Sequence, residues 1–205
     1  FYTSEGTAVS WTSRYGSVTF NQNGKEMPYG GMNEKGLAVE MLWLDYTSYY
    51  DVAALPYLNE LEWIQYQLDN YQSVAEVLSN LEKLSIRPFK GKIHYIVADP
   101  SGHSVVIEHI GGKILHQEKT AQSCQVITNY DIKSSENWFS NKANASKGNV
   151  TNALYRYVVL QSEIQKPQFG AKLSVPAALE LMEDVAIKKG SFKTYWTIVY
   201  DLQAR

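Results

Sequence analysis

The sequence predicts an α+β protein in which helix pairs pack outside antiparallel β-sheets. Short runs of apolar and β-branched residues, bounded by Gly, Pro and Asn, predict strands in separate regions of the chain. Two groups of segments carry apolar residues at helical spacing instead. The resulting order is strands, a helix pair, strands, a second helix pair and a final strand. This order suits two antiparallel sheets with helices on their outer faces.

The N-terminal region predicts a β-hairpin. Residues 8–12 and 17–21 have strand-like composition, and the intervening Ser13-Arg14-Tyr15-Gly16 is typical of a turn. Asn23-Gly24 marks a further turn.

A glycine-rich stretch follows and precedes an apolar run from Leu37 to Leu44. Its glycines are Gly30, Gly31 and Gly36. Glycine tolerates positive φ and allows backbones to approach closely. The stretch therefore predicts a tight turn that leads into a buried strand.

Two helices are predicted next. Residues 59–70 place Leu61, Ile64 and Leu68 at helical spacing. Ser73 begins the second helix, with Glu76 three positions later as in a capping box.

The central region predicts an antiparallel meander. Its turns are Asp99-Pro100-Ser101-Gly102 and Gly111-Gly112, both of which have turn-forming composition. The strands between and around these turns are expected at residues 93–98, 104–109, 113–117 and 123–128.

The C-terminal region predicts a polar loop, two helices and a strand. Residues 130–150 are rich in Asn, Ser and Lys, which favours a long exposed loop with glycosylation sequons at Asn144 and Asn149. Residues 151–165 have helical spacing, with Pro167 just beyond them. A second helix is expected to begin at Ser174 and to end near Gly190 as its C-cap, followed by a strand at residues 194–202.

Composition and charge exclude several partner classes. The chain has 205 residues, a formal net charge of −2 and 44% hydrophobic residues, which is ordinary for one globular domain. This charge gives no reason to expect nucleic acid or an anionic membrane as a partner. No apolar run is long enough to span a bilayer.

The cysteine and histidines do not form an obvious catalytic or metal site. Cys124 is the single cysteine, so an intrachain disulfide is impossible. It lies in a predicted apolar strand without a neighbouring base, which favours a buried structural role over that of a nucleophile. The histidines lack metal-ligand spacing and are expected to be ordinary strand or turn residues: His94, His103, His109 and His116.

A tyrosine-rich segment follows the apolar run that ends at Leu44. Two interpretations are balanced: a cleft wall that contacts a substrate, or a surface loop held down by aromatic packing. The tyrosines concerned are Tyr46, Tyr49, Tyr50 and Tyr57.

Three sequence blocks carry a family resemblance: Gly31-Met32-Asn33-Glu34-Lys35-Gly36-Leu37, Val126-Ile127-Thr128-Asn129 and Leu154-Tyr155-Arg156-Tyr157. They resemble the choloylglycine hydrolase family, which contains penicillin V acylases and bile salt hydrolases. The resemblance extends from about residue 11 to residue 202. It implies the αββα sandwich of the N-terminal-nucleophile hydrolases, formed by two antiparallel sheets flanked by helix pairs. It also implies hydrolysis of the non-peptide C–N bond of linear amides, without a metal or organic cofactor.

The resemblance assigns roles to three residues. The Asn that ends the second block helps to form the family's oxyanion hole, which implies that role for Asn129. The backbone N–H that completes the hole belongs to an Asn or Tyr in the family, and Trp43 stands at that position in this sequence. Arg156 matches the family's Arg near the nucleophile and is expected to position or activate a thiolate. Ala153 replaces the Ser of the family's block.

The family's nucleophile, a Cys at the mature N-terminus, is absent from these 205 residues, which begin at Phe1. The expectation is therefore a single truncated domain over residues 1–205 that lacks N-terminal and C-terminal strands and is inactive as it stands. The alternative is a non-catalytic relative that binds amide-like ligands in the same pocket. A structural or interaction domain of the same fold is a third, weaker interpretation.

The substrate is expected to be a small-molecule amide. Trp43 and the tyrosines at positions 46, 49 and 50 favour an aromatic or apolar acyl group, and a steroid is equally compatible. By resemblance the protein is expected to form a homo-oligomer, such as the tetramers common in the family. The sequence leaves open a bacterial cytoplasmic, periplasmic or secreted location.

Overall fold

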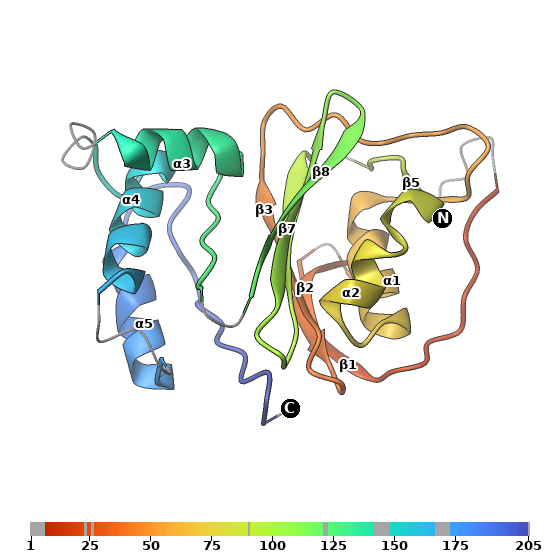
Figure 1. Cartoon of the computed structure of the whole chain (residues 1–205), viewed down its shortest axis with the longest axis horizontal. Helices are drawn as coiled ribbons and strands as arrows, with labels where there is room; N and C mark the ends of the chain where they lie inside the picture. Colours follow the sequence, from red (N-terminus) through yellow and green to blue (C-terminus); the bar gives the residue numbers. More distant parts are fainter. Residues whose placement is uncertain are drawn as a thin grey trace. The chain divides into compact units, whose positions relative to one another are not determined.

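The computed structural model divides the chain into two compact units, residues 1–123 with 201–205 and residues 124–200 (Figure 1). It describes residues 7–22, 24–25, 27–89, 91–120, 123–141, 148–166 and 173–204. Each unit has its own cluster of buried apolar side chains. The single domain expected over residues 1–205 stays a prediction.

The first unit is built on a six-stranded antiparallel sheet. Its spatial order is β1-β2-β3-β6-β7-β8, so two hairpin-connected groups of three strands meet where β3 pairs with β6. The strands are β1 Ser17–Asn21, β2 Pro28–Asn33, β3 Ala38–Trp43, β6 Ile93–Ala98, β7 Ser104–Ile110 and β8 Lys113–Lys119. The strands predicted at 17–21, 93–98, 104–109 and 113–117 are confirmed.

Two expectations for the N-terminal region are wrong. Residues 8–12 do not form a strand, and only Ala8 makes an isolated bridge, to Tyr57. Gly30 and Gly31 lie inside β2 and pair with Glu40 and Val39 of β3, so they are strand residues and not part of the turn. Their lack of a side chain serves close approach, because a Cβ on Gly31 would lie 2.5 Å from the carbonyl oxygen of Val18.

The turn between β2 and β3 is organised by Asn33, which is 1% exposed. Its Oδ1 accepts hydrogen bonds from the backbone N–H groups of Lys35 and Leu37, both at 3.0 Å. Its Nδ2 donates to the carbonyl oxygens of Leu68 at 2.8 Å and Tyr71 at 2.7 Å. The side chain therefore fixes the turn and joins it to the C-terminal end of the following helix.

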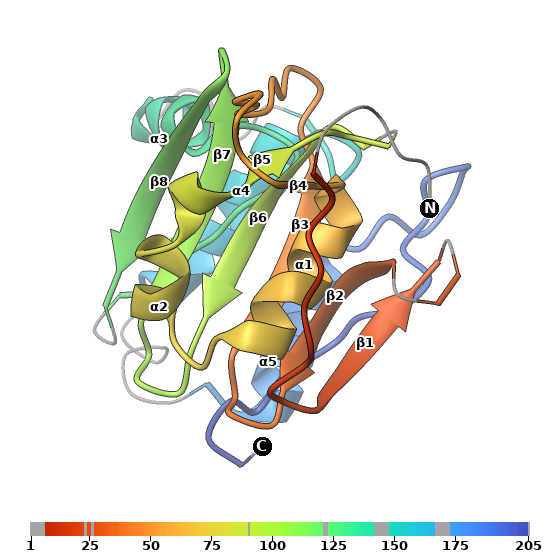
Figure 2. The ribbon, with the colours of Figure 1, turned by 90° about the vertical axis from the view of Figure 1, so that its right-hand side faces the viewer.

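Helices cover one face of this sheet, as Figure 2 shows. Helix α1 (Glu60–Asn70) begins at the N-cap Asn59 with a full capping box to Glu62. Helix α2 (Val74–Leu78) has the predicted N-cap Ser73, whose Oγ accepts from Glu76 N. A short 3₁₀ turn, η1 (Leu81–Lys83), follows it. In a capping box the Glu76 carboxylate would accept from Ser73 N, but it accepts from Gln72 N, one residue earlier.

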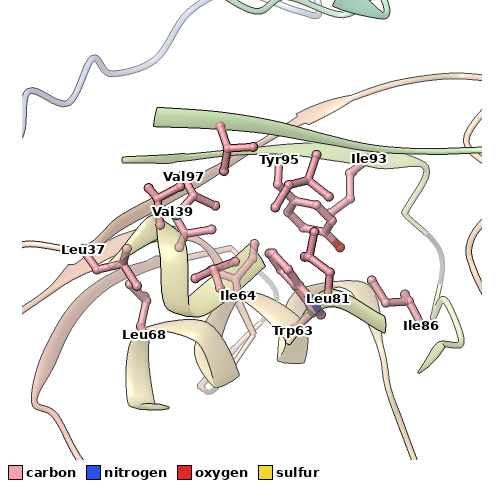
Figure 3. Close-up of a cluster of buried hydrophobic side chains, with 14 of the residues drawn as sticks. Leu37, Val39, Trp63, Ile64, Leu68, Leu81, Ile86, Ile93, Tyr95 and Val97 are labelled. Atoms are coloured by element: carbon pink, nitrogen blue, oxygen red, sulfur yellow. The ribbon is translucent and has the colours of Figure 1, made fainter. Parts of the chain in front are cut away.

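The core of the first unit lies between these helices and the sheet (Figure 3). Trp63 of α1 and Tyr95 of β6 stack at its centre, with ring centroids 4.3 Å apart. The Tyr95 hydroxyl donates to the carbonyl oxygen of Glu60, so the large ring is buried without an unpaired polar atom. The apolar stripes predicted from helical spacing, including Leu61, Ile64 and Leu68, are buried in this core.

A second, two-stranded parallel sheet was not predicted. It joins β4 (Tyr57–Leu58) to β5 (Ser85–Ile86), which precede and follow the helices. Runs of two residues are too short to show a period, so sequence patterning had no signal for them.

His109 is a buried histidine near the end of β7. It is 3% exposed, and its Nδ1 accepts a hydrogen bond from Tyr50 N at 3.2 Å. Burial disfavours the imidazolium and lowers the pKa of His109 to about 4. The ring is therefore neutral near pH 7, with its proton on Nε2.

The described residues of the second unit form three helices with irregular connections. They are α3 (Ile132–Ser140), α4 (Ala153–Ile164) and α5 (Val175–Asp184). Their shared cluster contains Val126, Tyr157, Leu160, Leu181 and Val185. The helices predicted at residues 151–165 and after Ser174 are confirmed, and Ser174 caps α5 through Ala177 N.

Several predictions for this unit are wrong. Residues 123–128 and 194–202 are not strands, because a strand needs a hydrogen-bonded neighbour and the structure describes only a Thr128–Tyr130 bridge there. The polar stretch 130–150 contains α3, which Asp131 initiates by accepting from Ser134 N. Helix α5 ends at Asp184, so Gly190 is not its C-cap. Asn23, the sequon at Asn144 and Pro167 lie outside the described residues.

The α+β class is confirmed by the large antiparallel sheet and the helices packed on it. Within the described part of the chain, no helix combines the length and the apolar character needed to cross a bilayer.

Replacing Asn33 with Ala should strongly destabilise the first unit. The change leaves two carbonyl and two N–H groups without the partners that Asn33 supplies, at a cost of about 3 kcal/mol. Urea unfolding would measure the loss. Asn21→Ala is the control, since Asn21 is exposed and its side chain donates to Thr19 Oγ1 in an exposed hydrogen bond. Equal stability of both variants would contradict the role of Asn33.

Gly31→Ala should destabilise the protein by about 1–3 kcal/mol, because the new Cβ would press on backbone and on Leu68. Gly30→Ala should cost less, since the three atoms nearest to a Cβ there all belong to the flexible carboxylate end of Glu40. The two midpoints of chemical unfolding provide the comparison. A larger loss for Gly30→Ala would overturn this assignment of close backbone approach.

His109 should make stability depend on pH between about 6.5 and 4. Above pH 6.5 the imidazole is neutral in both the folded and the unfolded states. As the pH falls below 6.5 the unfolded chain binds a proton that the folded chain does not, so the free energy of unfolding falls by up to about 3 kcal/mol. His109→Gln should flatten this part of the stability profile relative to the wild type, and an unchanged slope would refute the prediction.

Candidate functional site

Asn129 is held at the junction between an irregular segment and a helix. The neighbouring residues Thr128 and Tyr130 form an isolated antiparallel bridge. Asp131 then caps α3, its Oδ1 accepting from Ser134 N at 2.9 Å. Bridge and cap constrain the backbone on both sides of Asn129, whose side chain is half-buried.

Arg156 projects from the first turns of α4, which the N-cap Asn152 begins. Its Nη2 donates to Asn129 Oδ1 at 2.7 Å, and its Nη1 donates to the carbonyl oxygen of Val150 at 2.8 Å. Burial lowers the pKa of the guanidinium. An arginine nevertheless stays protonated in a protein, so the group acts only as a donor.

The Arg156 contact orients the Asn129 amide. Because a guanidinium can only donate, it selects the carbonyl oxygen of the amide and turns Nδ2 away. No residue in the described ranges accepts a hydrogen bond from Asn129 Nδ2. The arrangement therefore presents an oriented N–H₂ group that can donate to an oxyanion.

Trp43 is the last residue of β3. Next to the β3–β6 pairing, Leu44 N donates to Lys92 O at 2.8 Å. Leu44 and every second residue before it in β3 are therefore the ones that form hydrogen bonds with β6. The pattern alternates along antiparallel strands, so the N–H of Trp43 points away from β6. On that side the pairing of β3 with β2 ends at Glu40 and Gly30. The Trp43 N–H thus lies beyond the ladder of the described strands, where it can serve as a donor.

The Trp43 side chain is 45% exposed and is fixed by a hydrogen bond from Nε1 to Asp45 Oδ1. Tyr46 is equally exposed at 45%. Each of these rings is therefore accessible to solvent at or just after the end of β3.

Tyr49 and Tyr50 are bound into the body of the first unit. The Tyr49 hydroxyl donates to Gly91 O at 2.9 Å and accepts from Ile93 N at 3.1 Å, and burial raises its pKa well above the usual value. Tyr50 N donates to His109, and its carbonyl oxygen accepts from Ile86 N. These contacts fix the segment, and the Tyr49 hydroxyl has a structural role because it bonds to the backbone of Gly91 and Ile93. A substrate-binding role for the two residues stays a prediction.

Among the predicted site residues, the structure brings Asn129 and Arg156 into direct contact in the unit of residues 124–200. Trp43, Tyr46, Tyr49 and Tyr50 belong to the unit of residues 1–123. A cavity of about 370 Å³ in that unit is lined by residues of α2, η1 and β8 and by none of the predicted site residues.

Cys124 and the histidines differ partly from expectation. Cys124 is exposed, so the prediction of a buried cysteine is wrong, since the apolar strand expected around it does not form. His94 is buried beside Glu108, with Nδ1 3.1 Å from Oε1. His103 and His116 lie near Glu118. The described residues contain no group of His, Cys, Asp and Glu that could hold a metal ion.

The carbonyl oxygen of Val150 was missed as a partner of Arg156. Its position depends on the turn that precedes α4, where Thr151 N donates to Asn149 Oδ1 and Asn152 caps the helix. Asn152 immediately precedes the first apolar residues of the helix, and this spacing is the sequence signal that locates the helix start.

The comparison with curated proteins finds a penicillin V acylase. A penicillin V acylase from Pectobacterium atrosepticum is 35% identical over 139 residues, a match that covers 60% of this chain and 36% of the relative. The chain therefore spans about a third of the length of that curated relative.

The similar solved structures have the same fold. The penicillin V acylase from Agrobacterium tumefaciens is 28% identical, with a TM-score of 0.70 over 93% of this chain and 62% of the acylase. A variant of the conjugated bile acid hydrolase from Clostridium perfringens is 17% identical, with a TM-score of 0.72 over 90% of this chain and 68% of the hydrolase. This likeness shows the fold alone.

The family model of the linear amide C–N hydrolases, choloylglycine hydrolase family, matches residues 4–197. This match includes β3, the Asn129–Arg156 contact and nearly all of both units. The chain therefore belongs to the choloylglycine hydrolase family of linear amide C–N hydrolases.

Proposed function

We propose that the protein containing this chain hydrolyses the C–N bond of a small linear amide, of the penicillin V or conjugated bile acid kind. The observation that carries the proposal is the 2.7 Å hydrogen bond from Arg156 to Asn129 Oδ1. It leaves the Asn129 Nδ2 group directed away from the guanidinium, as an oxyanion donor requires. Family membership supports the reaction class.

The proposed reaction begins with attack of a thiolate on the amide carbonyl carbon. The carbonyl electrons move to oxygen, and Asn129 Nδ2 donates to that oxyanion. Collapse of the tetrahedral intermediate breaks the C–N bond. The amine leaves with the proton that the base took from the thiol, and a thioester remains. Water then hydrolyses the thioester to the carboxylic acid and regenerates the thiol.

The nucleophile implied by the family is an N-terminal Cys whose own α-amino group acts as the base. Cys124, the single cysteine of the 205 residues, lies inside the sequence. The proposal concerns a protein that carries such a cysteine at its mature N-terminus. The alternative is a relative that binds amide-like ligands without turnover.

The acyl side of the substrate is proposed to be aromatic or apolar. The half-exposed rings of Trp43 and Tyr46 provide a surface for such a group near the end of β3. Trp43 is fixed by Asp45, so it can contact an acyl group without losing much side-chain freedom.

The first experiment is to determine the codons upstream of Phe1 and to assay the natural full-length protein with penicillin V and with a conjugated bile acid. A processed N-terminal Cys and release of the amine support the proposal. Ligand binding without turnover, or another residue at the processed N-terminus, would instead favour the non-catalytic alternative.

In an active full-length protein, Asn129→Ala should lower kcat by about 10²–10³-fold with little change in KM, because the lost donor acts mainly on the transition-state oxyanion. Steady-state kinetics on the substrate that is turned over provide the measurement. Ser140→Ala, an exposed change at the end of α3 in the same unit, is the control. Nearly full kcat in Asn129→Ala would remove Asn129 from the oxyanion hole.

A further inference from the structure

The two hydrogen bonds of Arg156 join two separate segments of the second unit. Nη2 binds the side chain of Asn129, and Nη1 binds the backbone oxygen of Val150, which lies shortly before the start of α4. The guanidinium is planar and rigid, so fixing one of its nitrogens on the backbone also fixes the direction of the other. Both distances, 2.8 and 2.7 Å, are typical of charge-assisted hydrogen bonds.

An asparagine amide has two orientations that differ by exchange of its oxygen and nitrogen. Only one of them can stabilise an oxyanion, since the other directs Oδ1 at the developing negative charge. Among the described residues, Arg156 supplies the hydrogen bond that distinguishes the two ends of the Asn129 amide. A group that can only donate is suited to this task, because it cannot accept a bond from the flipped amide.

We propose that Arg156 is a positioning residue that holds the Asn129 amide in its donating orientation, in place of the role at the nucleophile that the family resemblance suggests. This inference rests on the proposed amide hydrolysis. The inference adds to the proposed function that Arg156 affects catalysis solely through the orientation of Asn129. The Val150 carbonyl acts as the anchor that sets the angle of the guanidinium.

A double-mutant cycle in the full-length protein tests the route of this effect. Arg156→Lys keeps the charge but loses the fixed pair of donors, so kcat should fall by at least about tenfold and by no more than the 10²–10³-fold loss of Asn129→Ala. In the Asn129→Ala background, Arg156→Lys should change kcat by no more than about twofold. Losses that multiply in the double variant would overturn the proposal.

The pH profile separates positioning from thiol activation. A residue that acts on the thiolate would shift the acid limb of kcat/KM when it is replaced. A residue that orients Asn129 lowers the whole profile and leaves the limb in place. Arg87→Lys, at an arginine paired with Asp51 in the other unit, is the matched control and should leave the profile unchanged. A shifted acid limb in Arg156→Lys contradicts the proposal.

A spectroscopic measurement keeps the inference testable if no amide is hydrolysed. In protein labelled with ¹⁵N-asparagine, the Asn129 side-chain resonances can be identified by their loss in Asn129→Ala. Arg156→Lys should shift or broaden these resonances, whereas Arg87→Lys should not. Unchanged resonances in Arg156→Lys would overturn the positioning role. If the wild type hydrolyses no amide but Arg156→Lys still changes the Asn129 resonances, the proposed function is rejected, whereas the positioning of Asn129 by Arg156 is supported.

Discussion

The structure of the first unit depends on the buried amide of Asn33. Its four hydrogen bonds hold the β2–β3 turn closed and attach it to the last turn of α1 and the residue beyond. This attachment sets α1 against the sheet, and the core that contains Trp63 and Tyr95 fills the space between them. The family motif around Asn33 therefore has a structural role, because it holds the β2–β3 turn against α1. Its link to function is indirect, since it fixes the start of the strand that ends at Trp43.

Asn33 and Asn129 show how the same side chain can serve structure or chemistry. Asn33 is 1% exposed, and both its oxygen and its nitrogen are fully used within the protein. Asn129 is half-buried, and Arg156 satisfies only its oxygen. Buried polar groups are normally paired, so an oriented donor left open to a ligand or to water is a feature that function can use. The difference between the two residues lies in their partners and not in their sequence neighbourhood.

Sequence patterning predicted the elements whose signals are local. The strands of the central meander, the cap of α5 at Ser174 and the buried stripe of α1 follow from turn residues, capping residues and spacing. It failed where an element depends on a distant partner. Residues 123–128 and 194–202 have strand composition, but strand pairing decides their conformation. Helix α3 was missed for the opposite reason. Its Ser-rich sequence has low helix propensity, and the helix packs against α4.

The candidate site was predictable in its residue types but not in its geometry. Asn129 and Arg156 are 27 positions apart, and nothing in their spacing indicates that one holds the other. The resemblance placed Arg156 beside a nucleophile, since a cation near a thiol is a common way to lower its pKa. Among the described residues, the guanidinium donates to an amide oxygen and a backbone carbonyl, neither of which carries a charge. A cation committed to two neutral acceptors keeps its charge available to polarise the Asn129 amide. That polarisation makes Nδ2 a better donor at the point where negative charge would develop.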